Sequence, residues 1–458
     1  MKHLYLLLII LLALALRIPG AFWGQIDFPK YEVWEPDEFQ HAEIAAQQIH
    51  ALGTTLFPNR DFSKIWNTKA YGKQIGLIAF GLKQMDWIAL RDSKLVFLGR
   101  FLSILYAVLL VLLTYHITKY LFQEVRIALL AALLLSIFDL NITYSHYAIP
   151  AISYVFWSHL SLYFVFLFHQ KVAQLKLTDS LLFFLFLPLP FAMTLATKLD
   201  FLPIVVLGLS GLLLLFQRQL CFQKLLMLSI WFLVLGSFYY LLAHGFDWNF
   251  EEAKRSFIVT KDLNENVVTK DQRWLHNPVL YLLGIIGGTS LPIFILSMIG
   301  AINLMRSNTS PRVNPQVMAL GWMVLLLFLE FLVRWQMDTP FIRRANIFLP
   351  FCAMTAAYAL HNVLGNKASK MLLLRHLLVV FIIVYTLGLT LSSQRNFWRD
   401  NRYAARDFIA ENIVGDAKIK YSMYAKIKYM PKETAQSLQD AEVLVLHETY
   451  YSRYWKSF

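Results

Sequence analysis

The chain has 458 residues, of which 58% are apolar and only 16% are charged, and its mean hydropathy is +0.51. A water-soluble protein carries about a quarter charged residues, so the composition excludes one large soluble globule. Because the apolar residues are concentrated in runs of about 20, long enough to cross a bilayer, we expect an all-α polytopic membrane protein.

The net charge of +13 is explained by Lys and Arg in cytoplasmic loops. No long basic run or basic stripe is present, so no nucleic-acid partner is expected. Cys221 and Cys352 are the only cysteines, and both lie in or beside apolar runs far apart in the sequence. They do not indicate a disulfide framework or a cysteine metal site.

The first apolar run covers about residues 3–22. Because no small-residue cleavage motif follows it, we interpret it as a retained first span rather than a signal peptide. A polar segment follows to about residue 91, and within it 75–89 predicts an interfacial helix. Ten further spans are expected, at about 97–118, 127–142, 150–169, 180–197, 199–216, 225–244, 279–305, 317–335, 342–363 and 373–391.

Charge predicts the orientation of these eleven spans. The loops on the side of the N-terminus are almost purely basic, whereas 245–278 mixes both signs, so the N-terminus is expected in the cytoplasm. The first loop (23–96), the loop 245–278 and the C-terminus then lie outside it. The count depends on the very short connection between 180–197 and 199–216, because losing one crossing there would invert everything downstream.

Two domains are expected. Residues 1–393 would form the transmembrane domain, and the polar tail 394–458 would form a small extracytoplasmic α/β domain. The tail contains a helical pattern over 403–413 and strand-like runs at 418–421 and 443–447.

Pro36-Asp37-Glu38, just after the first span, is the most informative segment. Pro36 suits the first turn of a helix, and no helix breaker follows before residue 49. Asp37 and His41 are four residues apart and share one face of that helix, while Glu38 points about 100° away. A carboxylate and an imidazole that converge at a membrane surface can abstract a proton or bind a metal. The alternative, in which both acids only stabilise the helix N-terminus, is left open.

His146 and Tyr147 lie in a second outer segment, Tyr144 to Pro150, which joins two predicted spans. His146 is a candidate ligand or hydrogen-bond donor, and the alternative is a solvated surface histidine. Lys198 lies in a third segment, where it would bind a lipid phosphate or instead extend to the interface and pair with Asp200.

A fourth outer segment contains Arg334, Arg343 and Arg344, on the side where basic residues are not needed for orientation. Guanidinium groups suit phosphate, since they donate two parallel hydrogen bonds. The alternative is pairing with Asp338 or with lipid headgroups.

These motifs resemble those of the GT-C membrane glycosyltransferases, above all the branch of protein O-mannosyltransferases and lipid A aminoarabinose transferases. Pro36-Asp37-Glu38 is similar to the acidic first-loop motif, and with Phe39-Gln40 it also resembles dolichyl-phosphate-mannose-dependent mannosyltransferases of the GPI and N-glycan pathways. The resemblance extends to three other segments: Ser145 to Pro150, Ala196-Thr197-Lys198, and Arg343-Arg344 to Pro350.

The resemblance implies an inverting transfer, in which an extracytoplasmic acceptor attacks a sugar and polyprenyl phosphate leaves. Asp37 would be the general base or lie beside a metal, with Glu38 as its neighbour. Together with His41, which shares a helix face with Asp37, these are the candidate catalytic residues. Lys198 and the Arg343–Arg344 pair would bind the lipid phosphate, and His146 would line the site.

A divalent metal ion is left open, with Asp37 and His146 as candidate ligands. Many relatives carry an acid after the second-loop proline, whereas this chain has Ala151. This departure favours a metal-free mechanism.

The expected function is therefore transfer of a sugar from a polyprenyl-phosphate donor to a lipid, glycan or protein outside the cytoplasm. One alternative is a transporter or lipid flippase, which predicts charges or helix breakers at mid-depth in the spans. Another is a glycan polymerase or ligase that uses a lipid-linked oligosaccharide.

Overall fold

A computed structural model describes most of the predicted membrane helices. The described residues are 2–22, 36–52, 70–87, 92–171, 188–197, 233–238, 273–307, 342–365, 372–398, 401–413, 417–421, 434–436 and 439–445.

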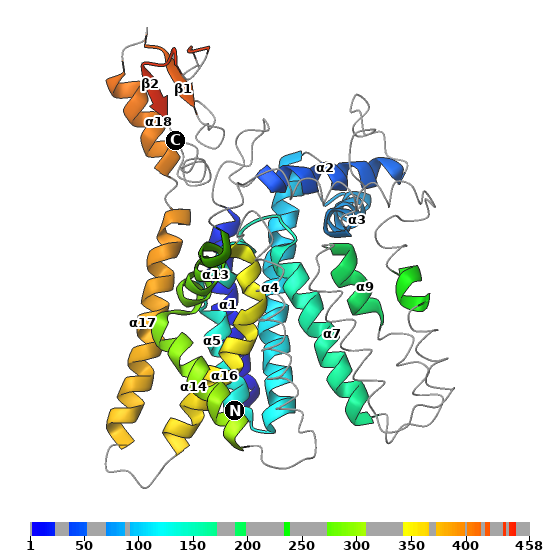
Figure 1. Ribbon diagram of the computed structural model, residues 1–458. Coiled ribbons are helices and arrows are strands. Elements are labelled where there is room, and N and C mark those ends of the chain that lie inside the picture. Colours follow the sequence, from blue (N-terminus) through cyan, green and yellow to red (C-terminus); the bar gives the residue numbers. More distant parts are fainter. Residues whose placement is uncertain are drawn as a thin grey trace.

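The described helices form a bundle that is capped at one end by two helices lying across it (Figure 1). The bundle contains α1 (Lys2–Ala21), α4 (Asp92–Phe122), α5 (Val125–Ser136), α6 (Asp139–Ser145), α7 (Ala151–Lys171), α9 (Pro188–Thr197), α13 (Arg273–Thr289), α14 (Leu291–Ser307), the 3-10 helix η2 (Ile342–Phe348), α16 (Leu349–Gly365) and α17 (Leu372–Trp398). The two capping helices are α2 (Pro36–Ala51) and α3 (Ala70–Gln84).

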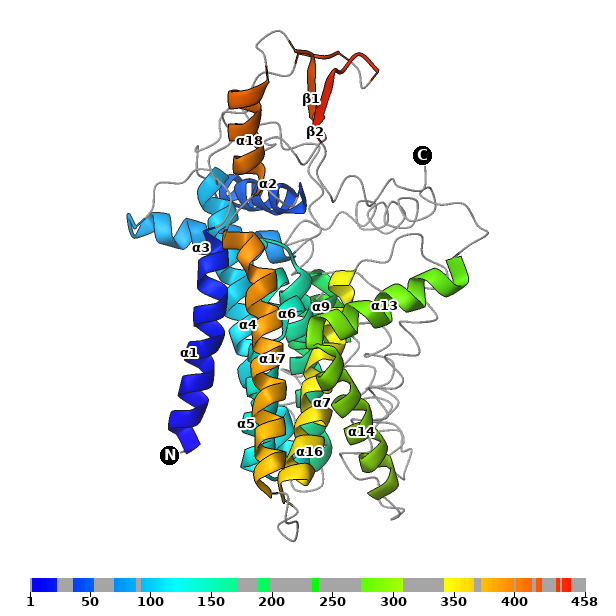
Figure 2. The same ribbon diagram turned by 90° about the vertical axis from the view of Figure 1, so that its left-hand side faces the viewer.

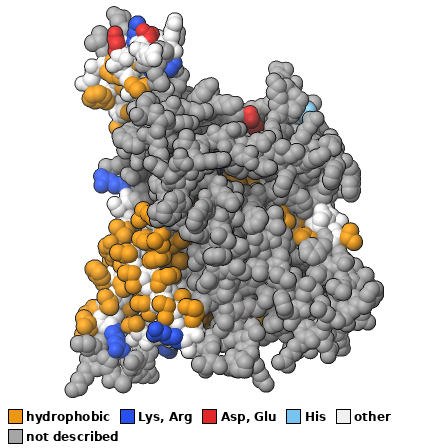
Figure 3. Space-filling model, viewed as in Figure 1, with side chains coloured by type: hydrophobic (Ala, Val, Ile, Leu, Met, Phe, Trp, Pro, Cys, Tyr) orange, Lys and Arg blue, Asp and Glu red, His pale blue; other side chains and the backbone are white. Residues whose placement is uncertain are grey.

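Four helices in the described part of the chain are long and apolar enough to cross a membrane, at Lys2–Ala21, Lys94–Phe122, Ala345–Leu364 and Leu373–Arg395. They coincide with four of the predicted spans. Figure 3 shows the broad apolar face that the bundle presents to its surroundings, and α17 contributes many of its exposed side chains, among them Leu373, Leu377, Leu378, Phe381 and Val384. Lipid tails suit such a face, since monomeric soluble proteins rarely expose large contiguous apolar patches.

Two predicted spans are broken rather than continuous. The run 127–142 consists of α5 and α6, bent by 57°, and the run 279–305 consists of Tyr281–Thr289 and Leu291–Arg306, bent by 104°. At the second break Ser290 adopts a left-handed φ of 83°, and its hydroxyl bonds the Thr386 hydroxyl of α17 at 2.8 Å. The predicted spans 199–216 and 317–335 lie outside the described residues, and 180–197 and 225–244 are described only in part.

Small residues allow the closest helix contacts. A Cβ on Gly300 of α14 would overlap the Thr355 carbonyl of α16, and the Ser297 and Thr355 hydroxyls lie 2.7 Å apart at the same crossing. Close approach of this kind is common between helices in membranes, where packing and hydrogen bonds drive association.

The helix predicted at 75–89 is α3, which begins and ends earlier, at Ala70 and Gln84. It ends where Asp86 takes a positive φ of 55°. Two of its glycines, Gly72 and Gly76, pack against α2: a Cβ on Gly76 would lie 2.8 Å from the Ala45 carbonyl. The two capping helices therefore form one layer over the end of the bundle (Figures 1 and 2).

The tail contains α18 (Asn401–Asn412) and two short parallel strands, β1 (Ile419–Tyr421) and β2 (Val443–Val445), in the register Ile419↔Val443. Ile409, Ile419 and Tyr421 form a small core between the helix and the strands. The predicted helix and strand runs are thus present in the described part of the tail, beyond the end of α17 (Figure 2). The last two positions of the run predicted at 443–447 lie outside the described residues.

Candidate active site

The site is built around the α6–α7 loop, residues 146–150, which lies at the same end of the bundle as α2 and α3. Pro150 immediately precedes α7, and the Tyr154 N–H donates to the Pro150 carbonyl at 2.9 Å, so the loop leads directly into a regular helix. The last turn of α6 and this loop together contain the second predicted segment, Tyr144 to Pro150.

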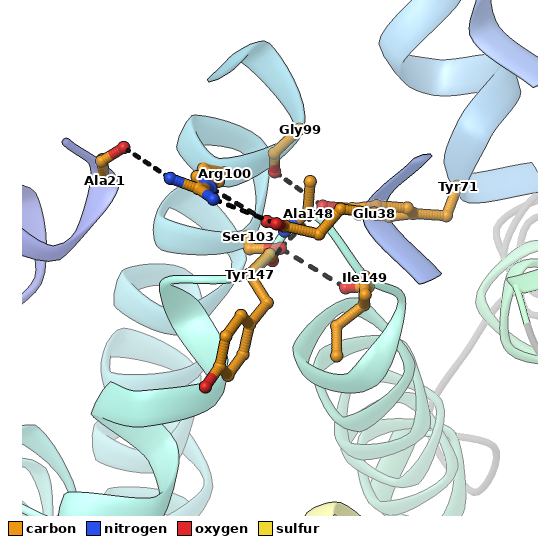
Figure 4. Close-up of polar contacts among 9 residues, drawn as sticks. All are labelled: Ala21, Glu38, Tyr71, Gly99, Arg100, Ser103, Tyr147, Ala148 and Ile149. Carbon is orange, nitrogen blue, oxygen red and sulfur yellow. Dashed lines mark hydrogen bonds and ion pairs between the residues drawn. The ribbon is translucent and has the colours of Figure 1, made fainter. Parts of the chain in front are cut away.

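Glu38 and Arg100 form a buried two-point ion pair between α2 and α4. Arg100 Nε lies 2.8 Å from Glu38 Oε1, Arg100 Nη2 lies 2.9 Å from Oε2, and the two side chains are 2% and 0% exposed. Glu38 Oε1 also accepts the Ala148 N–H at 2.8 Å, while Arg100 Nη1 donates to the Ala21 carbonyl at 3.3 Å (Figure 4). One carboxylate therefore joins the first-loop motif to α4 and to the α6–α7 loop.

The close approach of this loop to α4 depends on Gly99. A Cβ there would lie 2.7 Å from the Ala148 side chain and 2.9 Å from Ile75, closer than real Cβ contacts. With glycine at 99, the Ala148 N–H reaches the carboxylate that Arg100 binds.

Two hydroxyl groups hold the loop on its other side. Tyr71 Oη lies 2.6 Å from both the Gly99 carbonyl and Ser103 Oγ, and Ser103 Oγ lies 2.8 Å from the Tyr147 carbonyl and 3.4 Å from the Ile149 carbonyl. Each hydroxyl has one hydrogen, so the two share these acceptors. Burial raises the pKa of Tyr71 well above its usual value, which keeps the phenol neutral and able to donate.

His41 lies beside this network. Its side chain is 1% exposed, and its ring meets the Tyr71 ring edge-on with centroids 5.3 Å apart. His41 is three residues after Glu38 on the same helix, so both side chains project toward the buried side of α2.

His146 is fully buried, so the alternative of a solvated surface histidine is wrong. Its ring packs on the backbone of Gly20, where any Cβ would overlap it. Burial and the positive charges of Arg17 and Arg100 lower the pKa of His146 to about 3, against a hydrogen bond with the Leu16 backbone that acts in the opposite direction. His146 is therefore neutral at physiological pH.

The predicted phosphate-binding residues are described less completely. Arg343 is half-buried in η2, and its carbonyl accepts Asn346 Nδ2 at 3.1 Å. Lys198, Arg334 and the side chains of Asp37 and Arg344 lie outside the described residues. The predicted convergence of Asp37 with these cations is thus a proposal.

Among the residues whose side chains are described, no group of three or more His, Cys, Asp or Glu side chains lies close enough together to bind a metal ion. His146, one of the two candidate ligands, lies next to two guanidinium groups, which would repel a divalent cation. This environment disfavours His146 as a metal ligand and leaves Asp37 as the candidate.

Four residues of this network were absent from the predicted site: Arg17, Tyr71, Arg100 and Ser103. For Arg17 and Arg100 the sequence does contain a signal, because each is an isolated arginine near the end of an apolar run. Such residues are rare within spans and mark functional positions. Tyr71 and Ser103 gave no signal in the sequence.

One segment of the chain matches a known protein family. The sequence pattern of the dolichyl-phosphate-mannose-protein mannosyltransferase family matches residues 89–251, a segment that includes Arg100 and the α6–α7 loop. No curated protein matches the chain.

Two solved membrane enzymes have similar structures. The apo oligosaccharyltransferase of Archaeoglobus fulgidus is 16% identical, with a TM-score of 0.55 over 96% of this chain and 61% of its own. The same enzyme, AglB, with an inhibitory peptide and a dolichol-phosphate gives 15% identity and a TM-score of 0.53 over 96% of this chain and 61% of that chain. This chain thus spans about three fifths of the archaeal enzyme's length.

ArnT from Cupriavidus metallidurans, bound to undecaprenyl phosphate, is 12% identical, with a TM-score of 0.58 over 99% of this chain and 94% of its own. AglB and ArnT are both GT-C glycosyltransferases. The family match and the two structural relatives agree, and the chain is a membrane protein with the fold of the GT-C glycosyltransferases.

Proposed function

We propose that this protein is a glycosyltransferase that moves a sugar from a polyprenyl-phosphate donor to an acceptor outside the cytoplasm, with inversion. The observation that supports this most is the Glu38 carboxylate, which binds Arg100 and the Ala148 N–H together. This contact joins the two outer motifs on which the transferase interpretation was built.

The proposed base is Asp37, the neighbour of Glu38 in the first turn of α2. Glu38 accepts two hydrogen bonds from Arg100 and one from Ala148, and its charge is paired with a buried guanidinium. These contacts suit it to orienting α2 rather than to exchanging a proton. We therefore assign Glu38 a positioning role and Asp37 proton abstraction from the acceptor.

In the proposed reaction the acceptor oxygen or nitrogen attacks the anomeric carbon as the bond to the phosphate oxygen breaks. Asp37 takes the acceptor's proton, and polyprenyl phosphate leaves with the bonding electrons. Lys198, Arg334, Arg343 and Arg344 would neutralise the phosphate charge that develops. His41, His146 and Tyr147 would line the acceptor and sugar side.

The donor's lipid tail would lie against apolar helix faces, with its phosphate at the outer interface. ArnT bound to undecaprenyl phosphate and AglB with a dolichol-phosphate support a polyprenyl phosphate as the donor's carrier. The N-terminus is proposed to be cytoplasmic, residues 1–393 to form the transferase domain and 394–458 a small outer domain. The sugar and the acceptor are left to experiment.

Mass spectrometry of glycolipids and glycoproteins from cells with and without the gene tests the function. We expect one sugar modification to disappear without the gene and to return with the wild-type chain. If the two profiles are identical under conditions of expression, the transferase proposal is wrong.

A further inference from the structure

Arg17 is a charged residue fully buried in α1, a helix long and apolar enough to span a membrane. Its guanidinium donates to the Ala13 carbonyl at 3.0 Å, to the Ser136 carbonyl at 3.0 Å and to Asn141 Oδ1 at 2.7 Å. Among the described residues it has no carboxylate partner. Burying such a charge is costly, and an apolar side chain would cost less, so its presence suggests a specific task.

The contacts of Arg17 lie at the break between α5 and α6. A bend of 57° interrupts the helical hydrogen bonds there, which leaves carbonyl groups of the last turn of α5 in need of donors. Arg17 bonds the Ser136 carbonyl, and the Thr390 hydroxyl of α17 bonds the Ile137 carbonyl at 2.7 Å. A cation also suits the negative end of a helix dipole.

Helix α6 is held on its α17 side as well. Asp139 accepts Ser393 Oγ at 3.1 Å and Gln394 Nε2 at 2.8 Å, and the same Gln394 nitrogen lies 2.9 Å from Thr143 Oγ1. The short helix is thus fixed between α1 and α17 and leads directly into the α6–α7 loop.

Arg17 also lies next to the loop itself. His146 packs on Gly20, one turn after Arg17 on the same helix, and it interacts with the charge of Arg17. Two residues further on, the Ala148 N–H binds Glu38. A continuous set of contacts therefore connects Arg17 to the carboxylate beside the proposed base.

We propose that Arg17 is a positioning residue. By satisfying the broken end of α5 and orienting α6, it fixes the α6–α7 loop so that the Ala148 N–H meets Glu38 and α2 takes its working orientation. Its effect on catalysis rests on the proposed transferase function, whereas its effect on the loop does not.

Hydrogen exchange on the full-length protein, without substrate, tests the structural part. In R17Q the guanidinium is lost, and we expect the Ala148 amide to exchange at least about tenfold faster, while amides in α16 exchange as in wild type. R17K keeps the charge without the planar fork and should give an intermediate rate. The control is R126Q, which removes an exposed arginine near the other end of α5 and should leave Ala148 unchanged.

Unchanged exchange at Ala148 in R17Q overturns the proposal. A uniform increase that includes α16 also overturns it, since that result means only a loss of global stability. If R17Q does not fold, the same two criteria are applied to R17K.

Sugar-transfer kinetics test the catalytic part. Misplacement of a reacting group by about 1 Å can cost about 10²-fold in rate, so R17Q should lower kcat by about that factor with little change in the donor KM. Faster exchange at Ala148 with an unchanged kcat would contradict a role in transfer. Failure to find any transfer by the wild-type chain would instead count against the proposed function and leave the exchange result standing.

Discussion

The Glu38 carboxylate and the Arg100 guanidinium are 62 residues apart in sequence, yet they form a two-point ion pair at 2.8 and 2.9 Å with almost no solvent exposure. The pair joins α2 to α4, and the same carboxylate binds the Ala148 N–H of the α6–α7 loop. One carboxylate thus joins three elements at the candidate site.

Removing one partner of this pair should destabilise the protein strongly, because the other charge stays buried. We expect E38Q and R100Q each to lower the free energy of unfolding by about 3–5 kcal/mol, and the double variant E38Q/R100Q to lose less than the sum. Unfolding curves in detergent measure the loss in unfolding free energy for the two single variants and for the double variant. D407N, which breaks the exposed Arg406–Asp407 pair at 2.7 Å, is the control and should cost about 0–1 kcal/mol. Additive losses would show that the pair is not coupled.

Gly20 should tolerate no side chain, because the His146 ring occupies the position of its Cβ. G20A is expected to destabilise the protein by about 1–3 kcal/mol through overpacking and to displace the α6–α7 loop. G388A in α17 is the matched control: nothing lies within 4 Å of its Cβ, so it should be neutral or stabilising by up to about 1 kcal/mol. Equal melting temperatures for the two variants would contradict the packing of His146 on α1.

The buried His146 predicts a loss of stability in acid. Its pKa is lowered to about 3, below the unfolded value of about 6.5, so the unfolded chain takes up a proton first and stability falls as pH decreases from about 6.5 toward 3. H146N removes this titration. Melting temperatures at pH 7.5 and pH 5 should therefore differ less in H146N than in the wild type, and an equal or larger difference would argue that His146 is accessible to protons.

Arg343 is proposed to bind the donor phosphate. R343A should raise the donor KM by roughly tenfold or more with little change in melting temperature, because a charge-assisted hydrogen bond contributes about 1.5–3 kcal/mol. R395A, which removes an exposed arginine near the end of α17, controls for general attraction of the anionic lipid to a basic surface. If both variants change the KM equally, the effect is not specific to Arg343.

The sequence predicts the helices better than their breaks. Runs of about 20 apolar residues locate α1, α4, α16 and α17, because length and hydropathy are local properties. The bend after Ser136 has no proline or glycine at the break. The carbonyls at the break accept hydrogen bonds from Arg17 and Thr390, which are distant in sequence. Patterns within a single run contain no information about such partners.

In the candidate site, too, the sequence predicts the motifs but not the partners that are distant in the chain. The motifs containing Glu38 and His146 are recognisable as residue types at an outer surface, and the structure brings them together. The residue that joins them, Arg100, is one arginine in an apolar run, and its partner is set by the packing of α2 across α4. The sequence also places Glu38 among the candidate catalytic residues, because residue type alone does not reveal that Arg100 and Ala148 already bind its oxygens.

The central claim is that Asp37 is the base of a sugar transfer from polyprenyl phosphate. The direct test is release of polyprenyl phosphate from a labelled polyprenyl-phosphate sugar by purified wild-type and D37N protein, with an extract of cell-envelope acceptors. The wild type should release the lipid phosphate as the sugar moves to the acceptor, and D37N should be slower by about 10²–10⁴-fold with an unchanged melting temperature. Release by D37N at the wild-type rate, or no release by the folded wild type, would contradict this account.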